Sequence, residues 1–201
     1  MEITNTEVYG IEASLRGMRN PMNSWHLQDT SANNIGANDM DLAKRLIKAG
    51  PEHCKFLRQI QVWADFDMPL YWWSEFDTYK FNTKNSCSTM HKLFNAKKEI
   101  ELSDFVFSEE EKPVLTFIIS ELNSLREKYL QTKDVNYLIR GKRLLPASFK
   151  QKRTVNTNYA ELMNIYSQRK NHRLKEEWQE VFCKWCEGFP YFVEFIEAKG
   201  K

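Results

Sequence analysis

The sequence lacks the patterns that mark the most common nucleotide, hydrolase and metal sites. None of GxGxxG, GxxxxGK[ST] or GxSxG occurs, which excludes the usual dinucleotide, phosphate-loop and nucleophile-elbow motifs. The four histidines show neither HxxH nor HExxH spacing, so we predict no metal site. No apolar run is long enough to span a bilayer and no signal peptide is evident, so we expect a cytoplasmic protein without a membrane partner.

An excess of one charge is also missing. The 29 basic and 27 acidic side chains give a net charge of +2, so the composition does not favour a nucleic-acid polymer as partner. Hydrophobic residues make up 42% and aromatic residues 13%, enough to build a core at a length of 201 residues. We therefore expect a single folded domain over residues 1–201.

Cysteine is scarce, and its spacing argues against metal. The four cysteines are Cys54, Cys87, Cys183 and Cys186, and we expect free thiols in a cytoplasmic protein. Cys183 and Cys186 form a CxxC, but zinc sites need four ligands and no second CxxC or paired histidines occur. The pair lies in an amphipathic helical pattern, which favours packing over metal or redox use.

Hydrophobic periodicity predicts an α/β (or α+β) fold, a mixed sheet flanked by a helix-rich C-terminal part. The predicted strands cover residues 2–9 and 56–66. The predicted helices cover residues 11–19, 39–49, 69–76, 108–129, 135–139, 158–169, 174–185 and 190–198. Residues 20–38 are rich in Asn, Ser, Gly and Asp and predict a long loop or flap.

Two polar segments are candidates for ligand binding. Residues 78–91, TYKFNTKNSCSTMH, form a polar loop without arginine or acid. On the predicted helix from Asn158, the residues Asn164 and Arg169 follow at intervals of six and five. Two amides and a guanidinium suit a ligand with carbonyls and phosphates, although the polar run of residues 168–173 is also typical of a solvated face. The aromatic run of residues 71–73 favours core packing over a platform for a planar ligand.

These segments, taken in order, resemble the flavin-dependent thymidylate synthases, whose signature is RHRxxSxNExSxRY. Aligned without a gap, residues 78–80 fall on RHR and residues 90–91 on the final Arg-Tyr, while Asn85 and Ser88 are identical to the signature. Lys80 keeps a positive charge.

The C-terminal third carries more of the resemblance. Leu144-Leu145-Pro146 is similar to the family's [VL]LP turn, and TVNTNYAELMNIYSQR to its helix with two asparagines. The resemblance places Asn158 and Asn164 on the two flavin-contacting asparagines and Arg169 on the pyrimidine-contacting arginine. Nearer the start, SLRGMRNP is similar to the family's RAAR segment, with Arg16 and Arg19 in place. His53 falls in the segment that holds the family's flavin-binding histidine.

The resemblance implies an α/β homotetramer with active sites at subunit interfaces. It implies FAD as cofactor, NADPH as reductant, and methylene transfer from methylene-tetrahydrofolate to dUMP without a protein nucleophile, so no catalytic residue is assigned. The expected cofactor-binding residues are His53, Tyr79, Asn158 and Asn164. The expected substrate-binding residues are Lys80, Asn85, Ser88 and Arg169.

The loop at residues 78–91 departs from this pattern in its charges. It has lost two arginines, a histidine and a glutamate, although arginine is well suited to hold a phosphate through two parallel charge-assisted hydrogen bonds. Two functions follow. The first is a flavin-dependent thymidylate-synthase-like protein acting on a pyrimidine deoxynucleotide such as dUMP, with a diverged substrate loop. The alternative is a catalytically inactive nucleotide- or partner-binding protein on the same scaffold.

Overall fold

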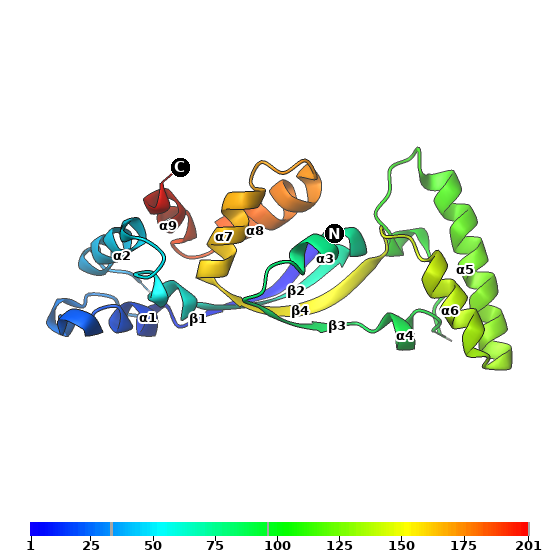
Figure 1. Ribbon diagram of the computed structural model, residues 1–201, viewed down its shortest axis with the longest axis horizontal. Coiled ribbons are helices and arrows are strands. Elements are labelled where there is room, and N and C mark those ends of the chain that lie inside the picture. The colour runs from blue at the N-terminus through cyan, green and yellow to red at the C-terminus, as the bar shows by residue number, and fades with distance from the viewer. Residues whose placement is uncertain (33, 96, 201) are drawn as a thin grey trace. The chain divides into compact units, whose positions relative to one another are not determined.

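The computed structural model describes residues 1–32, 34–95 and 97–200 (Figure 1). The chain divides into two compact units. Unit 1 comprises residues 66–78 and 85–153 together with Met1, and unit 2 comprises residues 2–65, 79–84 and those from 154 onward. Whether residues 1–201 act as a single domain stays a prediction.

Four strands form one sheet in the order β1-β2-β4-β3. They are β1 (Glu2–Tyr9), β2 (Gln61–Pro69), β3 (Thr83–Ser86) and β4 (Lys150–Asn158). On β2 every second side chain from Val62 to Met68 is buried, as expected for a strand with one face in the core. The predicted α/β class is confirmed, with the four strands antiparallel in place of a mixture of directions.

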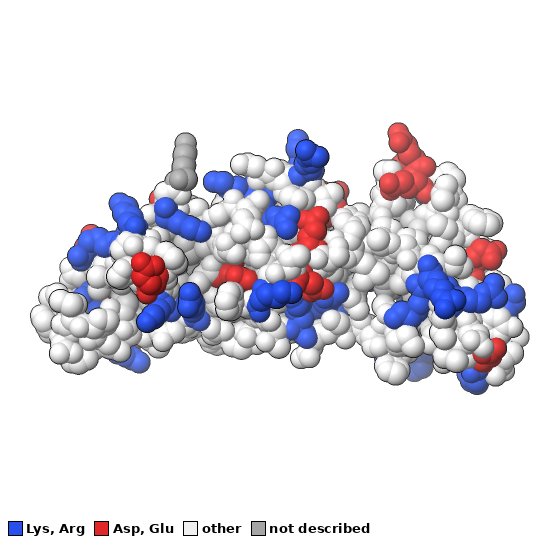
Figure 2. Space-filling model, viewed as in Figure 1, with Lys and Arg blue, Asp and Glu red and all other residues white. Residues whose placement is uncertain are grey.

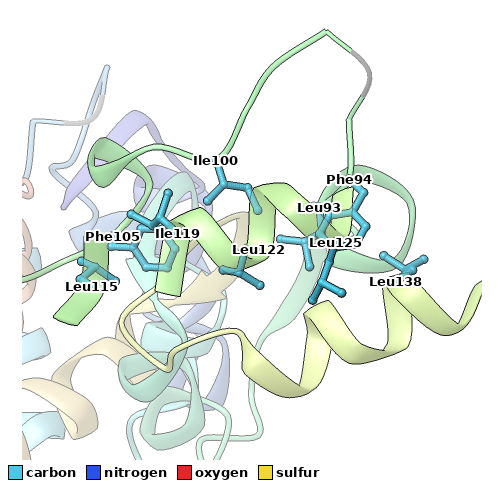
Figure 3. Packing of buried hydrophobic residues seen from close by; sticks show 9 residues of the cluster. All are labelled: Leu93, Phe94, Ile100, Phe105, Leu115, Ile119, Leu122, Leu125 and Leu138. Carbon is cyan, nitrogen blue, oxygen red and sulfur yellow. The ribbon is translucent and has the colours of Figure 1, made fainter. Parts of the chain in front are cut away.

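Unit 1 is built around a long helix and its neighbour. Its helical elements are α3 (Leu70–Phe76), α4 (Thr89–Lys92), the short η4 (Leu102–Asp104), α5 (Lys112–Thr132) and α6 (Val135–Leu144). On α5, residues 115, 119, 122 and 125 are buried at helical spacing, and Figure 3 shows them among the clustered side chains between α5, α6 and the preceding segment. A Cβ at Gly141 of α6 would lie 2.3 Å from the Phe94 ring, so this close packing requires glycine.

The aromatic run in unit 1 is core. Trp72 and Trp73 of α3 are fully buried and pack against Phe66 and Phe76, with ring centroids 4.9 to 6.0 Å apart. Core packing is therefore the correct interpretation of this run, and it offers no platform for a ligand.

Unit 2 contains the N-terminal and C-terminal helices. They are α1 (Ile11–Gly17), η1 (Asn20–Met22), η2 (Trp25–Leu27), α2 (Ala37–Ala49), η3 (Lys55–Arg58), α7 (Tyr159–Arg169), the π-helical η5 (Lys175–Cys183), α8 (Lys184–Glu187) and α9 (Phe192–Lys199). In Figure 1, α2 lies beside α9, and the two helices are in contact. Cys183 and Cys186 are buried free thiols, which confirms their predicted packing role.

A buried ion pair joins the first helices of unit 2. Arg19 Nε donates to Asp39 Oδ1 at 2.6 Å, and the two side chains are only 3% and 0% exposed. The second oxygen of Asp39 accepts from the Thr30 hydroxyl at 2.6 Å and from the Thr30 and Asp29 backbone N–H groups. Arg19, which the resemblance placed in the family's RAAR segment, therefore anchors the start of α2.

Four segments differ from the sequence predictions of local structure. The strand predicted from residue 56 begins at Gln61, because residues 55–58 form the helical turn η3 with Phe56 and Leu57 buried. The loop predicted at residues 78–91 contains β3 and α4. Strand β4 was missed, because KQKRTVNTN has a single apolar side chain, Val155, and hence no hydrophobic alternation. The loop predicted at residues 20–38 contains η1 and η2 and includes Asn33, which lies outside the described residues.

Among the described residues, no helix combines the length and the apolar character needed to cross a membrane.

Candidate functional site

The candidate site is a cavity of about 580 Å³ in unit 2, here called the amide cavity. This volume lies within the range of small-molecule sites. Its polar lining consists of Asn158, Glu161, Asn164, Cys54 and the three cations Lys48, Arg58 and Lys199. Its apolar lining includes Ile47, Pro51, Leu57, Phe81 and Met163.

Helix α7 supplies the amides. Asn158 ends β4 in an extended conformation and is the N-cap of α7, with its Oδ1 accepting from the Glu161 backbone N–H at 3.1 Å. Glu161 and Asn164 follow at intervals of three residues, a spacing that places side chains along one side of a helix. The cap at Asn158 thus fixes where the stripe of residues 158, 161 and 164 begins.

The hydrogen bonds within this stripe leave a defined pattern for a ligand. Asn158 uses its oxygen in the cap, and the oxygen of Asn164 accepts from Gln168 Nε2 at 3.0 Å. Both amide nitrogens therefore retain donor capacity in the part of the chain that the structure describes. Glu161, which is buried, accepts from the Phe81 backbone N–H at 3.3 Å through one oxygen, and its second oxygen remains an acceptor. The stripe thus combines two amide donors with one carboxylate acceptor.

Tyr79 lies outside the cavity lining and connects to it indirectly. Its side chain is 7% exposed; its hydroxyl donates to Gln168 Oε1 at 3.0 Å and accepts from Arg169 Nε at 2.8 Å. Gln168 in turn donates to Asn164. Arg169 thus donates to Tyr79, Tyr79 to Gln168, and Gln168 to the side-chain oxygen of Asn164. Because this oxygen is already bonded, the side-chain nitrogen of Asn164 is the group left for a ligand.

Arg169 is held between aromatic rings at the C-terminal end of α7. Its guanidinium carbon lies 4.6 Å from the centroid of the Trp178 ring and 5.6 Å from that of Tyr79. Arg169 does not line the amide cavity. Its contacts with Tyr79 and Trp178 support the packing of η5 against α7.

The remaining residues predicted from the sequence lie at several places. His53 is exposed in the turn after α2, where its backbone N–H donates to the Gly50 carbonyl at 3.1 Å. Its neighbours Pro51 and Cys54 line the amide cavity, but His53 does not. Lys80 is exposed next to Phe81, and Asn85 is exposed on β3.

Ser88 belongs to a second cavity, in unit 1. This cavity, here called the lysine cavity, has a volume of about 230 Å³ and is lined among others by Cys87, Ser88 and four lysines, Lys92, Lys98, Lys150 and Lys152. The Ser88 hydroxyl is the N-cap of α4, accepting from the His91 backbone N–H at 3.4 Å.

Two of these lysines have acidic partners within the same lining. Lys98 lies 2.7 Å from Asp104, and Lys150 lies 3.6 Å from Asp67. Part of the positive charge that a phosphate would meet in this cavity is therefore already balanced.

Of the predicted residues, only Asn158 and Asn164 line the amide cavity, whereas Tyr79 and Arg169 contact each other outside its lining. The structure adds Glu161 to the same stripe, and this residue carried a signal in the sequence, an acid three residues after a capping asparagine. Phe81 is 72% exposed although it lines the cavity, and no sequence pattern indicated it. Lys48, Arg58 and Lys199 come from three separate elements and had no common motif.

Cys54 shows the electrostatic character of the cavity wall. Its thiol donates to the Gly50 carbonyl at 3.2 Å. Burial raises the pKa of this thiol, the positive charges of Lys199 and Arg58 act in the opposite direction, and the negative charge of Glu52 raises it further. Both cations therefore lie close enough to act on the same part of the wall.

Comparisons with known proteins support the fold. No family model matches the chain, and no curated protein matches it in sequence. Two crystal structures of the flavin-dependent thymidylate synthase ThyX from Helicobacter pylori, both with FAD and dUMP, match 100% of this chain. One has a TM-score of 0.73 at 16% identity over 98% of its own chain, and the other a TM-score of 0.75 at 17% identity over 100%. At this identity the likeness shows that the chain has the ThyX fold.

Proposed function

We propose that the chain binds a flavin in the amide cavity and is a flavin-dependent thymidylate-synthase-like protein. Its proposed cofactor is FAD, and its proposed substrate is a pyrimidine deoxynucleotide such as dUMP. The fold supports this, because the two ThyX structures contain both molecules. The fold alone does not specify a ligand, so the proposal depends on the site.

The observation that carries the proposal is the hydrogen-bonding pattern of α7. The isoalloxazine ring of a flavin has an imide edge, in which an N–H lies between two carbonyl oxygens. The stripe of Asn158, Glu161 and Asn164 offers the complementary donor, acceptor and donor. Ile47, Leu57 and Met163 supply apolar surface for the rest of the ring, as is usual for cofactor sites.

The protein's part in such a reaction is to bind and orient. A bound flavin supplies hydride-transfer chemistry, and the fold supplies its position and surroundings. Asn158 and Asn164 hold the imide carbonyls in this proposal, and Tyr79 keeps Asn164 oriented through Gln168. NADPH and methylene-tetrahydrofolate are the proposed reductant and one-carbon donor. We also propose a homotetramer, which light scattering on the purified chain would test.

A second function is favoured by the loop at residues 78–91. Ser88 is occupied as a helix cap, and two of the lysines near it are paired with acids. Arg169 is held by Tyr79 and Trp178. Lys80 and Asn85, the other two predicted substrate residues, are exposed. The alternative proposal is therefore a catalytically inactive nucleotide- or partner-binding protein that keeps the flavin cavity.

The test is flavin binding by the purified chain, followed by turnover. We expect absorbance in the flavin bands and a rise in melting temperature with FAD. Asn164→Ala should weaken FAD binding by about tenfold or more, because a flavin carbonyl would lose its donor inside the cavity. The matched control is Asn136→Ala on α6 of unit 1, an exposed residue that lines neither the amide cavity nor the lysine cavity.

Turnover then separates the two functions. NADPH oxidation that depends on dUMP would support the enzyme. FAD binding without such oxidation would support the inactive alternative. A colourless protein whose melting temperature is unchanged by FAD and by dUMP would refute both the enzyme and the inactive binding protein.

A further inference from the structure

A third cavity lies against strands β1 and β2 of the sheet and is here called the sheet groove. Its volume is about 660 Å³, within the range of small-molecule sites. Its lining comes wholly from unit 2 and includes Asn5, Glu7, Tyr9, Trp63, Asp65 and Thr154. Side chains two residues apart on a strand point to the same face, so residues 5, 7 and 9 of β1 and 61, 63 and 65 of the neighbouring β2 form one surface. Among the described residues, none lines both this groove and the amide cavity.

Two exposed aromatic rings form one wall of the groove. Tyr9 is 56% exposed and Trp63 is 38% exposed. Their ring centroids lie 5.9 Å apart and their planes make an angle of 75°. Both rings therefore keep accessible surface on the solvent side. The face of an aromatic ring attracts organic cations, and that of tryptophan does so most strongly.

The charged side chains of the groove are acidic. Asp65 is held through both oxygens, because Asn5 Nδ2 donates to Oδ2 at 2.9 Å and the Thr154 hydroxyl donates to Oδ1 at 2.5 Å. Glu7 is exposed and accepts from the Tyr9 hydroxyl at 2.6 Å through Oε2. In the part of the chain that the structure describes, its other oxygen keeps its capacity to accept. Glu7 is thus the carboxylate that the groove offers to a ligand, next to the aromatic wall.

Basic residues do not contribute to the groove. Of the described residues, no lysine or arginine lines it. On the face of unit 2 drawn in Figure 2, Lys and Arg side chains are prominent around α2 and α9, the helices beside the amide cavity. Close to the groove in sequence, Arg58 lines the amide cavity and Arg16 lines an adjoining cavity. On β4, Lys152 lines the lysine cavity and Arg153 pairs with Asp77 at 3.1 Å. The lining therefore favours a cation over an anion.

The hydrogen bonds of the groove select among cations. A primary ammonium group has three N–H donors and needs several acceptors. Both oxygens of Asp65 and one of Glu7 are already bonded within the protein. A quaternary ammonium group has no N–H to satisfy and binds through its charge and its methyl groups, which suits aromatic rings beside one carboxylate.

We propose that the sheet groove binds a small quaternary ammonium compound, whose charge lies against the rings of Trp63 and Tyr9 and beside Glu7. The flavin nucleotide and the deoxynucleotide proposed above are anions, so this ligand belongs to a different chemical class. The groove is also separate from the amide cavity. This site therefore stands independently of the proposed flavin function.

The experiment compares two ligands of one shape. Choline carries a trimethylammonium group, and its neutral carbon isostere carries a tert-butyl group in the same place. The full-length chain is titrated with each by isothermal titration calorimetry at low and high salt. We expect choline to bind about fivefold or more tightly than the isostere, with an advantage that shrinks at high salt. Trp63→Leu and Glu7→Gln should each weaken choline binding by about three- to fivefold.

Matched variants separate the groove from the rest of the surface. Trp25→Leu removes another exposed indole, and Glu2→Gln removes another exposed acid of β1, and neither residue lines the groove. Both variants should bind choline as the unchanged chain does. Melting temperatures of all four variants show whether each remains folded. Saturating FAD should leave the affinity for choline unchanged.

The outcomes keep this site apart from the flavin site. Absence of choline binding, equal binding of choline and its isostere, or a choline affinity that survives both Trp63→Leu and Glu7→Gln would overturn the inference and leave flavin binding untouched. Choline binding in a chain that binds no flavin would support the inference while refuting the proposed function.

Discussion

The amide cavity of unit 2 and the lysine cavity of unit 1 contain similar polar groups in different states. In the amide cavity, Asn158 and Asn164 use their oxygens within α7 and keep their nitrogens for a ligand. In the lysine cavity, the Ser88 hydroxyl caps α4, and Lys98 and Lys150 pair with acids. The first cavity therefore has unsatisfied recognition groups, whereas much of the second is satisfied within the protein.

This difference indicates where a ligand would gain binding energy. A ligand that pairs with an already oriented donor displaces only water, whereas a ligand that must break an ion pair loses what it gains. Similar side chains near a cavity are thus not equal evidence for a site. We expect the two cavities to respond to different extents to substitution and to flavin.

The largest difference should appear in stability. Asp39 is buried near the start of α2, and Asp39→Ala removes the partner of the buried Arg19. Helix α2 also carries Ile47 and Lys48, which line the amide cavity. Leaving an uncompensated buried charge costs about 3–5 kcal/mol in free energy of unfolding. Urea denaturation followed by tryptophan fluorescence would measure this loss, and FAD binding should weaken with it.

The corresponding change at the lysine cavity is Asp67→Ala. Its partner Lys150 is 3.6 Å away and both side chains are partly exposed, so at most about 1 kcal/mol should be lost. Equal destabilisation by the two variants would contradict the view that the buried Arg19–Asp39 pair anchors its part of the fold more strongly than the partly exposed Lys150–Asp67 pair does.

The sequence predicted helices better than strands, for a physical reason. Helix α7 had a capping asparagine, a helical period and a terminal arginine within one short segment, and its bounds were predicted closely. Strand β4 has alternating burial but mostly polar side chains on both faces, so it forms a strand because it pairs with β2 and β3. Such pairing is a tertiary property that a local pattern does not carry.

The same limit applies to the sites. Asn158 and Asn164 could be predicted together because one helix carries both. Lys48, Arg58 and Lys199 converge only after three separate elements have folded. Tyr79 fell on a position that the resemblance assigned to ligand binding, but in this chain it is buried and bonded to Arg169 and Gln168. Its proposed role in orienting Asn164 could not be read from its position in the loop.

A second prediction concerns Glu161, whose one oxygen is held by the Phe81 backbone N–H. In Glu161→Gln, the Phe81 N–H would keep the amide oxygen, so the amide NH₂ group would face the imide N–H of a flavin. Two donors would then oppose each other, and FMN binding should weaken by about tenfold.

A flavin methylated at the imide nitrogen provides the control. It has no N–H for the carboxylate to accept, so its weaker binding should be insensitive to Glu161→Gln. Binding of both flavins is measured by isothermal titration calorimetry on both proteins. Equal losses for the two flavins would mean that Glu161 acts through general charge and not through the imide edge.

The smallest expected effect compares the cysteine in each cavity wall. Cys87 of the lysine cavity is exposed, whereas Cys54 of the amide cavity is half-buried and donates to the Gly50 carbonyl at 3.2 Å. Burial raises the pKa of Cys54 above its ordinary value of 9.0, so it forms the reactive thiolate only at higher pH. Iodoacetamide should therefore alkylate Cys87 first and Cys54 several-fold more slowly, as peptide mass spectrometry would show.

Adding FAD to the alkylation experiment then tests which of the two cavities binds the flavin. Saturating FAD should slow alkylation of Cys54, because a ligand in the amide cavity covers its wall, and should leave Cys87 unchanged. In Cys87→Ser the protection of Cys54 should persist, which excludes an effect transmitted through modification of Cys87. Protection of Cys87 instead of Cys54 would place the flavin in the lysine cavity. The amide stripe on α7 would then have to be explained as packing, since the cavity that it lines would not be the one that binds the ring.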